Sequence, residues 1–224
     1  MLSSQGYETL KAVCDQQTCA ALAEQASAAC SAAAGTRNLL AEPWCQALVG
    51  RLLRHPGLAE RIPTGFLAVQ CTYFEKSSHC NWLVPLHQDL SIPVASRVDH
   101  PHLKGWSQKE GVTYVQPPEQ VLAELLAIRL HLDDCGPADG PLRVVPGSHR
   151  LGRLDAASMA RMHAVPIECL ARRGTALLLK PLILHASSKS TGRGRRRVLH
   201  ILFGPPTLPY GLSWRHAVRV ISDS

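Results

Sequence analysis

The first sixty residues show apolar positions at helical spacing. Asp15, a residue type that caps helices, precedes an alanine-rich segment that predicts a helix to about Ala33, ended by Gly35. Residues 43–54 predict a second helix, since their apolar positions recur at the same spacing: Trp44, Ala47, Leu48 and Leu52. Before both, residues 6–12 predict a short strand. We expect residues 1–62 to form a helical buttress against a sheet.

Beyond residue 62 the pattern changes to short apolar runs separated by turn residues, which is typical of strands. The expected strands cover residues 66–74, 83–85, 125–133, 142–145, 166–170, 174–179, 182–184 and 198–203. Many short strands after N-terminal helices predict a mainly β fold with flanking helices and a double-stranded β-helix (jelly-roll, cupin-like) core over residues 63–204. Residues 205–224 form a C-terminal tail in this interpretation.

One connection within this core is unusually long. Residues 90–118 contain Pro93, Pro101 and the pair at 117 and 118. A connection of this length in a compact domain is usually functional or disordered, so we interpret it as a lid loop over an active site. Trp106 either closes over a substrate or attaches the loop to the body of the domain.

Composition limits the class of protein. With 224 residues, 46% of them hydrophobic, residues 1–224 fit a single domain. We expect no secretion signal, and no stretch reaches the roughly 18 consecutive apolar residues of a membrane span. Its eight cysteines include no CxxC pair, which argues against structural zinc and a disulfide framework. We therefore expect a cytoplasmic protein without a membrane partner.

The net charge of +7 invites a nucleic-acid interpretation, because clustered arginines displace counterions from phosphates. Four arginines do cluster, at positions 193, 195, 196 and 197. However, aromatic residues make up only 5% of the chain and do not alternate with the basic positions, as base stacking requires. A small-molecule substrate is favoured over nucleic acid, and oligomeric state is left open.

The sharpest chemical signal is the tripeptide His87-Gln88-Asp89. If residues 83–85 end a strand, His87 and Asp89 share one face, because strand side chains alternate. A third ligand then comes from a distant strand, and His185 at the end of an apolar run is well placed. Two imidazoles and one carboxylate suit non-haem Fe(II) and oxygen activation, since they leave adjacent coordination positions open.

Three segments together resemble the phytanoyl-CoA dioxygenase family of Fe(II) and 2-oxoglutarate dependent oxygenases. They are residues 81–89, residues 128–150, which include Pro-Gly-Ser-His at 146–149, and residues 178–202. The resemblance implies that His87, Asp89 and His185 are the catalytic metal ligands. It further implies that Arg196 and Ser187 hold the far carboxylate of 2-oxoglutarate, although the adjacent Arg197 is an alternative.

The resemblance also implies the reaction. Fe(II), with O2 and 2-oxoglutarate as cosubstrates, would hydroxylate a C–H bond of a small molecule, releasing succinate and CO2. Halogenating relatives replace the carboxylate ligand to make room for chloride, so Asp89 favours oxygen transfer.

Other polar residues concern the substrate. Arg129 and His131 lie on one face of a predicted strand, and if that face is internal they suggest a small polar or anionic substrate, together with Trp106. Lys76, at the end of another strand, is interpreted as solvated rather than anion-binding. Ser148 and His149 are expected to shape their loop and not to bind metal.

Two further hypotheses belong to other classes. In a non-catalytic jelly-roll binding protein, the two histidines and the carboxylate would only form hydrogen bonds, and neither Fe(II) nor 2-oxoglutarate would be used. A nucleic-acid demethylase would use the same metal ligands but bind oligonucleotides in a salt-sensitive manner.

Overall fold

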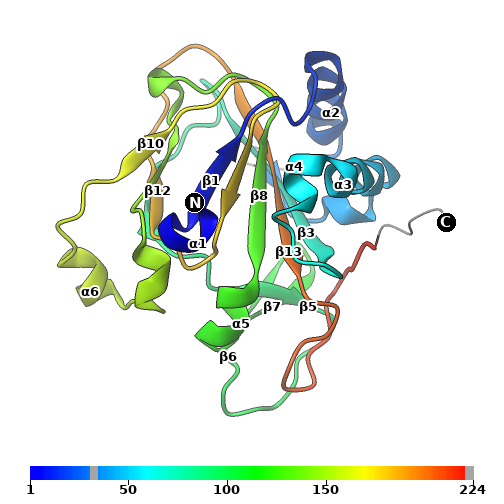
Figure 1. Ribbon diagram of the computed structural model, residues 1–224, viewed down its shortest axis with the longest axis vertical. Helices are drawn as coiled ribbons and strands as arrows, with labels where there is room; N and C mark the ends of the chain where they lie inside the picture. The colour runs from blue at the N-terminus through cyan, green and yellow to red at the C-terminus, as the bar shows by residue number, and fades with distance from the viewer. Residues whose placement is uncertain (31–34, 220–224) are drawn as a thin grey trace.

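Two antiparallel sheets form the centre of the protein, and helices cover the outer side of the larger one (Figure 1). The computed structural model describes residues 1–30 and 35–219. The prediction of a mainly β fold with flanking helices is confirmed. In the part of the chain that is described, no helix is both long and apolar enough to cross a bilayer.

The larger sheet has six strands in the order β1-β11-β8-β13-β3-β2. Its strands are β1 (Tyr7–Leu10), β2 (Gly35–Thr36), β3 (Leu67–Lys76), β8 (Leu126–His131), β11 (Ala176–Leu179) and β13 (Arg196–Gly204). Strand β13 pairs with β3 and β8 along most of its length. It therefore brings Arg196 and His200 into the middle of the sheet.

The smaller sheet has four strands in the order β10-β9-β12-β4. Its strands are β4 (Val84–His87), β9 (Leu142–Val144), β10 (Ile167–Cys169) and β12 (His185–Ser187). The strand expected at residues 182–184 is wrong, because β12 begins only at His185. A turn at Lys180 to Ile183, closed by a backbone hydrogen bond of 3.0 Å, occupies the expected segment.

The expected lid loop of residues 90–118 contains three strands. They are β5 (Ile92–Val94), β6 (Lys104–Lys109) and β7 (Val112–Gln116), in the order β5-β7-β6. Glu110 and Gly111 reverse the chain between β6 and β7 with positive φ angles of 50° and 75°, as a two-residue hairpin turn requires. The segment is thus a small sheet, and its role as a lid stays a prediction.

The N-terminal helices follow the sequence pattern in part. Helix α2 (Gln16–Ala28) begins where the Asp15 carboxylate accepts a hydrogen bond of 2.8 Å from the Thr18 N–H. It ends before the expected Ala33, and residues 31–34 lie outside the described residues. Helix α3 (Pro43–Arg54) agrees with the prediction. The remaining helices are short: α1 (Leu2–Gln5), η1 (Leu39–Ala41), α4 (Pro56–Ala59), α5 (Glu119–Glu124), η2 (Pro137–Asp139), η3 (Ser148–Leu151) and α6 (Ala156–Ala160).

The two faces of the larger sheet meet different cores. On β8, Leu126, Ile128 and Leu130 pack with the helices, whereas Ala127 packs in the core between the sheets. Because side chains alternate, Arg129 shares the inner face with Ala127. The internal orientation of this polar face is therefore the correct one.

A bulge in β3 directs polar side chains inward. Leu202 pairs with Gln70 while the next residue, Phe203, pairs with Ala68, so Val69 is an extra residue. The extra residue shifts the alternation, and Gln70, Thr72 and Phe74 all line the internal cavity. This irregularity cannot be inferred from a regular strand pattern.

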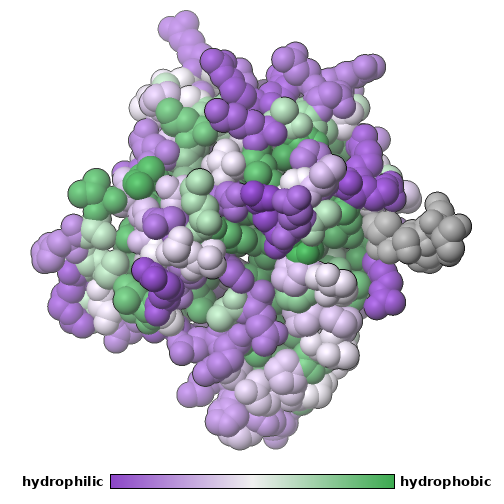
Figure 2. Space-filling view, in the orientation of Figure 1, coloured by the Kyte–Doolittle hydropathy of each residue, from purple (hydrophilic) through white to green (hydrophobic). Residues whose placement is uncertain are grey.

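The surface in Figure 2 is largely hydrophilic, with apolar side chains gathered on the side where β10 and α6 lie. Four large apolar residues of this region are exposed: Leu151, Val165, Ile167 and Leu170. Strand β10 is an edge strand, so it presents Ile167 to solvent. This region lies apart from the internal cavity, none of whose lining residues belong to it.

Candidate active site

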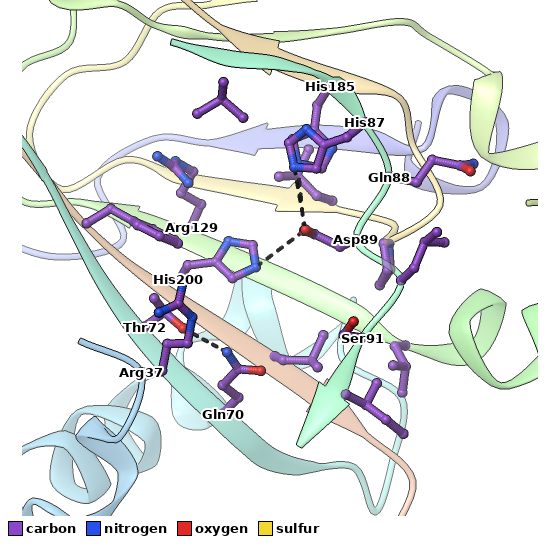
Figure 3. A pocket seen from close by; sticks show the side chains of 18 of the residues that line it. Arg37, Gln70, Thr72, His87, Gln88, Asp89, Ser91, Arg129, His185 and His200 are labelled. Carbon is purple, nitrogen blue, oxygen red and sulfur yellow. Dashed lines mark hydrogen bonds and ion pairs between the residues drawn. The ribbon is translucent and has the colours of Figure 1, made fainter. Parts of the chain in front are cut away.

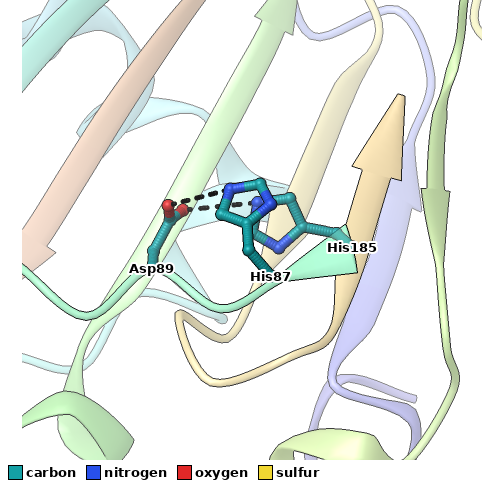
Figure 4. Close-up of side chains that lie close together, drawn as sticks. All are labelled: His87, Asp89 and His185. Carbon is teal, nitrogen blue, oxygen red and sulfur yellow. Dashed lines mark ion pairs between the residues drawn. The ribbon is translucent and has the colours of Figure 1, made fainter. Parts of the chain in front are cut away.

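Strand pairing brings the two predicted histidine ligands together. His87 on β4 is the register partner of His185 on β12, and their ring centroids are 4.2 Å apart (Figure 4). The two positions are separated by nearly one hundred residues in the chain. The antiparallel pairing of β4 with β12 therefore builds half of the site.

Asp89 completes the group from the loop that follows β4. Its carboxylate oxygens lie 3.8 Å from His87 Nε2 and 3.7 Å from His185 Nε2. The three ligand atoms all lie within 4.8 Å of one another, a spacing that one metal ion can bridge. Figure 4 shows the carboxylate facing both rings.

The orientation of both imidazoles suits metal binding. His87 Nδ1 lies 2.9 Å from the Pro85 carbonyl oxygen, and His185 Nδ1 lies 2.9 Å from that of Ile183. A carbonyl accepts only, so each Nδ1 carries the hydrogen and donates it. Each Nε2 then presents a lone pair toward Asp89, which is the usual arrangement of metal-binding histidines.

Gln88 fixes the loop between the two ligands. Its amide nitrogen donates to the carbonyls of Gly152 and Leu182 at 2.8 and 2.7 Å, and its amide oxygen accepts from the Leu154 N–H at 2.9 Å. The side chain is buried and its polar atoms are satisfied. The residue between the ligands is thus an anchor of their backbone, a role that the sequence alone does not reveal.

Ser148 holds the second ligand strand. Its hydroxyl donates to the Val145 carbonyl at 2.7 Å and accepts from the Leu184 N–H at 2.8 Å, next to His185. His149 instead lies 3.1 Å from the Ser3 carbonyl through Nε2. The Pro-Gly-Ser-His segment shapes its loop, as predicted.

A third histidine, which the sequence analysis did not single out, adjoins the site. His200 Nε2 lies 4.0 Å from Asp89 Oδ2, and its ring meets Phe74 edge-on. Burial lowers the pKa of His200 to about 4, so the ring is neutral at pH 7. Its Nδ1 is buried without a hydrogen-bond partner in residues 1–30 and 35–219.

The carboxylate of Asp89 is ready to bind a cation. Burial raises the pKa of Asp89, but the neighbouring imidazoles, His185 foremost, outweigh this effect and the pKa lies below its ordinary value. Because 44% of the side chain remains exposed, water reaches it from the cavity. Asp89 is therefore ionised at neutral pH.

Three buried cations lie beyond the triad. Lys76, Arg129 and Arg196 are each less than 10% exposed, and none forms an ion pair with a carboxylate of the described chain. Burial, followed by the charge of Arg196, lowers the pKa of Lys76 to about 8 and that of Arg129 to about 9. The interpretation of Lys76 as a solvated lysine is wrong, because Lys76, the last residue of β3, is only 1% exposed.

A cavity of about 440 Å³ connects the triad to two of these cations, Arg129 and Arg196. Figure 3 shows Asp89 between His185 and His200, with Arg129 and the pair Gln70 and Thr72 around it. Gln70 Nε2 donates to the Thr72 hydroxyl at 2.8 Å. The sequence analysis missed Gln70 and Thr72, because the bulge that turns them inward leaves no pattern.

Of the residues predicted to bind the cosubstrate, two line the cavity and the alternative Arg197 does not. Ser187 and Arg196 line the cavity, and Arg196 Nη1 donates to the Gly140 carbonyl at 2.7 Å. Arg197 points to the opposite face and pairs with Asp133 at 2.7 Å. Among the two arginines, only Arg196 is placed to meet a molecule in the cavity.

The predicted substrate residues divide as well. Arg129 lines the cavity, whereas His131 is completely buried behind it, and burial lowers the pKa of His131 to about 3. Trp106 is partly buried against the core between the sheets, and the guanidinium carbon of Arg97 lies 5.5 Å from the centre of the Trp106 ring. Trp106 does not line the cavity. Of its two predicted roles, only attachment of this segment to the body of the domain has contacts in the structure.

Comparison with known proteins places the chain in a family. Residues 2–198 match the family described as phytanoyl-CoA dioxygenase. The chain is 29% identical over 189 residues to an L-proline trans-4-hydroxylase of Streptomyces griseoviridis, a match that covers 70% of this chain and 63% of that protein. The chain thus spans less than two thirds of this curated relative.

Solved structures share the fold. The epimerase SnoN, in complex with Fe3+, alpha-ketoglutarate and nogalamycin RO, superposes with a TM-score of 0.68 at 14% identity, over 100% of this chain and 88% of SnoN. HygX of Streptomyces hygroscopicus, with nickel, 2-oxoglutarate and hygromycin B bound, gives 0.61 at 15% identity over 91% and 84% of the two chains. These likenesses confirm the predicted jelly-roll core. Since the family match covers most of its length, the chain belongs to the phytanoyl-CoA dioxygenase family.

Proposed function

We propose that the protein is an Fe(II) and 2-oxoglutarate dependent dioxygenase that hydroxylates a C–H bond of a small anionic metabolite. One oxygen atom of O2 would enter the hydroxyl group of the product and the other would enter succinate, with release of CO2. The observation that supports this proposal best is the joint arrangement of the metal-ligand triad and unpaired buried cations around one cavity.

The donor set fits iron. Two imidazoles and one carboxylate bring their ligand atoms within 4.8 Å of one another, and all three residues line the cavity. Bound Fe(II) would supply the activation of O2 that C–H hydroxylation requires. His87, Asp89 and His185 would hold the metal, while the Pro85 and Ile183 carbonyls keep both rings in the ligating tautomer.

The cavity also fits the cosubstrate. Arg196 is 2% exposed, and its Nε has no hydrogen-bond partner among the residues described. An unpaired buried guanidinium is costly unless an anion meets it. Arg196 and the Ser187 hydroxyl would receive the far carboxylate of 2-oxoglutarate by charge-assisted hydrogen bonds. The related structures of SnoN and HygX contain this keto acid.

The charge of the cavity supports an anionic substrate. Among the residues that the structure describes, four cationic side chains line it, namely Arg37, Lys109, Arg129 and Arg196, and one carboxylate does, that of the candidate ligand Asp89. Arg37 is already paired with Glu110 at 2.9 Å. If 2-oxoglutarate occupies Arg196, then Arg129 and Lys109 remain for the substrate.

The size of the cavity favours a metabolite rather than a polymer. A volume of about 440 Å³ accommodates 2-oxoglutarate together with a molecule of amino-acid size. The relative that hydroxylates L-proline acts on a carboxylate of this size. The Gln70 and Thr72 pair would add hydrogen bonds to a polar part of the substrate.

The test is anaerobic loading with Fe(II) and 2-oxoglutarate, followed by admission of O2 and measurement of succinate across a panel of small carboxylic and amino acids. The expected result is succinate release that one class of anion stimulates and that His87→Ala abolishes. Absence of Fe(II) binding and of 2-oxoglutarate turnover would instead favour a non-catalytic binding protein. Stimulation by methylated oligonucleotides alone would favour a demethylase.

A further inference from the structure

Two cysteine side chains meet at the start of helix α2, away from the candidate active site. Asp15 is the N-cap of this helix, so Cys14 precedes the cap and Cys19 is the fourth residue of the helix. Side chains at these two positions pack together where a helix begins. The Cys19 Sγ accordingly lies 4.0 Å from the Cys14 carbonyl oxygen. Neither cysteine lines the cavity, so the proposed function makes no use of this pair.

The backbone holds both cysteines against the larger sheet. The N–H groups of Val13 and Cys14 donate to the Gly174 carbonyl at 2.8 and 3.2 Å, just before β11. On the helix side, the Cys19 Sγ lies 3.9 Å from the carbonyl oxygen of His131, the last residue of β8. Because the chain is anchored on both sides of the pair, the two sulfur atoms stay close together in the folded protein.

The two thiols differ in access to water and in acidity. Cys14 is half-buried, whereas Cys19 is 0% exposed. A hydrogen bond from the Cys19 thiol lowers the pKa of Cys14 and outweighs the effect of burial. The same hydrogen bond, followed by burial, raises the pKa of Cys19. Cys14 is therefore the thiol that ionises and meets solutes, and Cys19 is the protonated thiol behind it, as in pairs of nucleophilic and resolving cysteines.

A second pair of cysteines lacks this access. Cys45 of α3 and Cys71 of β3 also share a hydrogen bond, but both residues are 0% exposed. Burial, followed by this hydrogen bond, raises the pKa of Cys71. Thiolates react with oxidants whereas buried thiols are inert, so this pair should stay reduced. It provides an internal control for the exposed pair.

We infer that Cys14 and Cys19 are a redox-active dithiol, a modification site at which hydrogen peroxide forms a reversible disulfide across the first turn of α2. The Cys14 thiolate attacks one oxygen of the peroxide, the O–O bond breaks, and a sulfenic acid and hydroxide result. The Cys19 thiol then attacks the sulfenic sulfur, so the S–S bond forms, the S–O bond breaks and water leaves. The hydroxide takes up the proton that Cys14 had released. Two thiols are oxidised in total, and one peroxide is reduced to two water molecules.

The experiment treats the reduced, folded chain with hydrogen peroxide, without added Fe(II), so that iron does not decompose the oxidant. The remaining thiols are blocked with N-ethylmaleimide, and the chain is cleaved after basic residues and after glutamate. The fragment of residues 12–24 then contains both cysteines of this pair and no other cysteine. Mass spectrometry is expected to find it two hydrogen atoms lighter and without maleimide. Two of the eight thiols should be lost and should return with dithiothreitol.

Two variants assign the roles within the pair. In Cys19→Ala the sulfenic acid on Cys14 has no thiol to condense with, so dimedone should trap it. In Cys14→Ala the thiol of Cys19 should stay reduced, because it is buried. Cys45→Ala is the matched control and should form the same disulfide as the wild type. Circular dichroism checks that each variant is folded and that oxidation leaves the wild type folded.

Three results would overturn the inference. The wild type could keep all eight thiols under peroxide, or Cys14 could be oxidised to a sulfinic acid without a disulfide to Cys19. The disulfide could also form only with loss of the circular dichroism of the folded protein, in which case the two thiols meet in the unfolded chain alone. None of these results bears on the proposed function, because the metal-ligand triad and the cavity contain neither cysteine.

Discussion

His87 and His185 lie opposite each other on β4 and β12, and a break in the register follows immediately, because Ser187 pairs with Val84. A step of two residues along β12 is therefore matched by a step of three residues along β4. The irregularity sits beside the candidate metal position, where bulges commonly redirect side chains. It allows Val84 and His87, three residues apart on β4, both to line the cavity, whereas His185 and Ser187 share that side by regular alternation.

Replacing His185 should remove metal binding. With His185→Ala, only one imidazole and one carboxylate remain, and we expect the affinity for Co(II) to fall by more than about 100-fold, since even outer partners of ligands contribute 10- to 100-fold. Titration followed by the visible absorption of bound Co(II) measures the effect. His163→Ala, at an exposed position, is the control and should bind like the wild type.

Unchanged Co(II) binding in His185→Ala would mean that the three side chains form hydrogen bonds only. The same result would remove the basis for placing a 2-oxo acid in the cavity.

The sequence was informative where metal-ligand residue types occur at the spacing of one face of a strand. The spacing of His87 and Asp89 and the apolar run before His185 were sufficient to propose the triad, because alternation on strands determines which side chains share a face. The helix at residues 43–54 followed from periodicity alone. Family resemblance was needed for Arg196, since spacing does not distinguish it from Arg197.

The sequence did not predict the features that depend on tertiary packing. Lys76 at a strand end has the pattern of a solvated lysine, and its burial depends on the pairing of β3 with β13. The bulge at Val69 leaves no residue signature, so Gln70 and Thr72 could not be assigned to the cavity. The expected lid loop contains prolines and glycines, and its strands form only through mutual pairing.

Gln88→Leu should weaken the metal site without touching the metal. The substitution leaves the Gly152 and Leu182 carbonyls and the Leu154 N–H without their partner, which we expect to cost about 1–3 kcal/mol of folding free energy. The segment that carries His87 and Asp89 then loses its anchor, and Co(II) affinity should fall about 10-fold or more. Urea unfolding and Co(II) titration measure the two effects.

The matched control is Gln120→Leu, an exposed glutamine of helix α5. It should change neither stability nor metal affinity by a measurable amount. A Gln88→Leu protein with wild-type affinity for Co(II) would show that the ligand loop keeps its geometry without this anchor.

Arg129→Met should separate substrate binding from cosubstrate binding. Because Arg129 lines the cavity near the triad and has no carboxylate partner in the described chain, its loss should raise the KM of an anionic substrate about 10- to 100-fold. The affinity for 2-oxoglutarate should change far less than in Arg196→Met. Steady-state kinetics with the substrate found by the panel, beside calorimetry with 2-oxoglutarate, checks this.

An equal loss of 2-oxoglutarate affinity in Arg129→Met and Arg196→Met would assign both arginines to the cosubstrate. In that case the anionic character proposed for the substrate would rest on Lys109 alone. Arg161→Met, on the exposed surface, controls for the loss of a positive charge.

The binding of 2-oxoglutarate should weaken as the pH rises through about 8. Burial, then Arg196 and Arg129, lower the pKa of Lys76 to about 8, while Cys135 acts in the opposite direction. The charged form attracts the dicarboxylate, and it disappears above this pH, so affinity should fall by up to about 10-fold between pH 7 and pH 9. Calorimetry with the Ni(II)-loaded protein measures the profile, and 2-oxovalerate, measured in parallel, reports any effect of pH on the metal itself.

For the ligand-free protein, the titration of Lys76 should have the opposite effect, because it should raise stability as the pH increases. Between pH 8 and pH 10.5 the unfolded chain holds a proton on Lys76 that the folded chain has lost, so this lysine makes stability rise with pH across that window. Lys76→Met should remove both trends, because it carries no titrating group, and it should stabilise the ligand-free protein by about 1–3 kcal/mol. A Lys76→Met protein that keeps the wild-type pH profile for 2-oxoglutarate would assign the titration to another residue. Lys189→Met, which leaves Lys76 in place, should retain both trends.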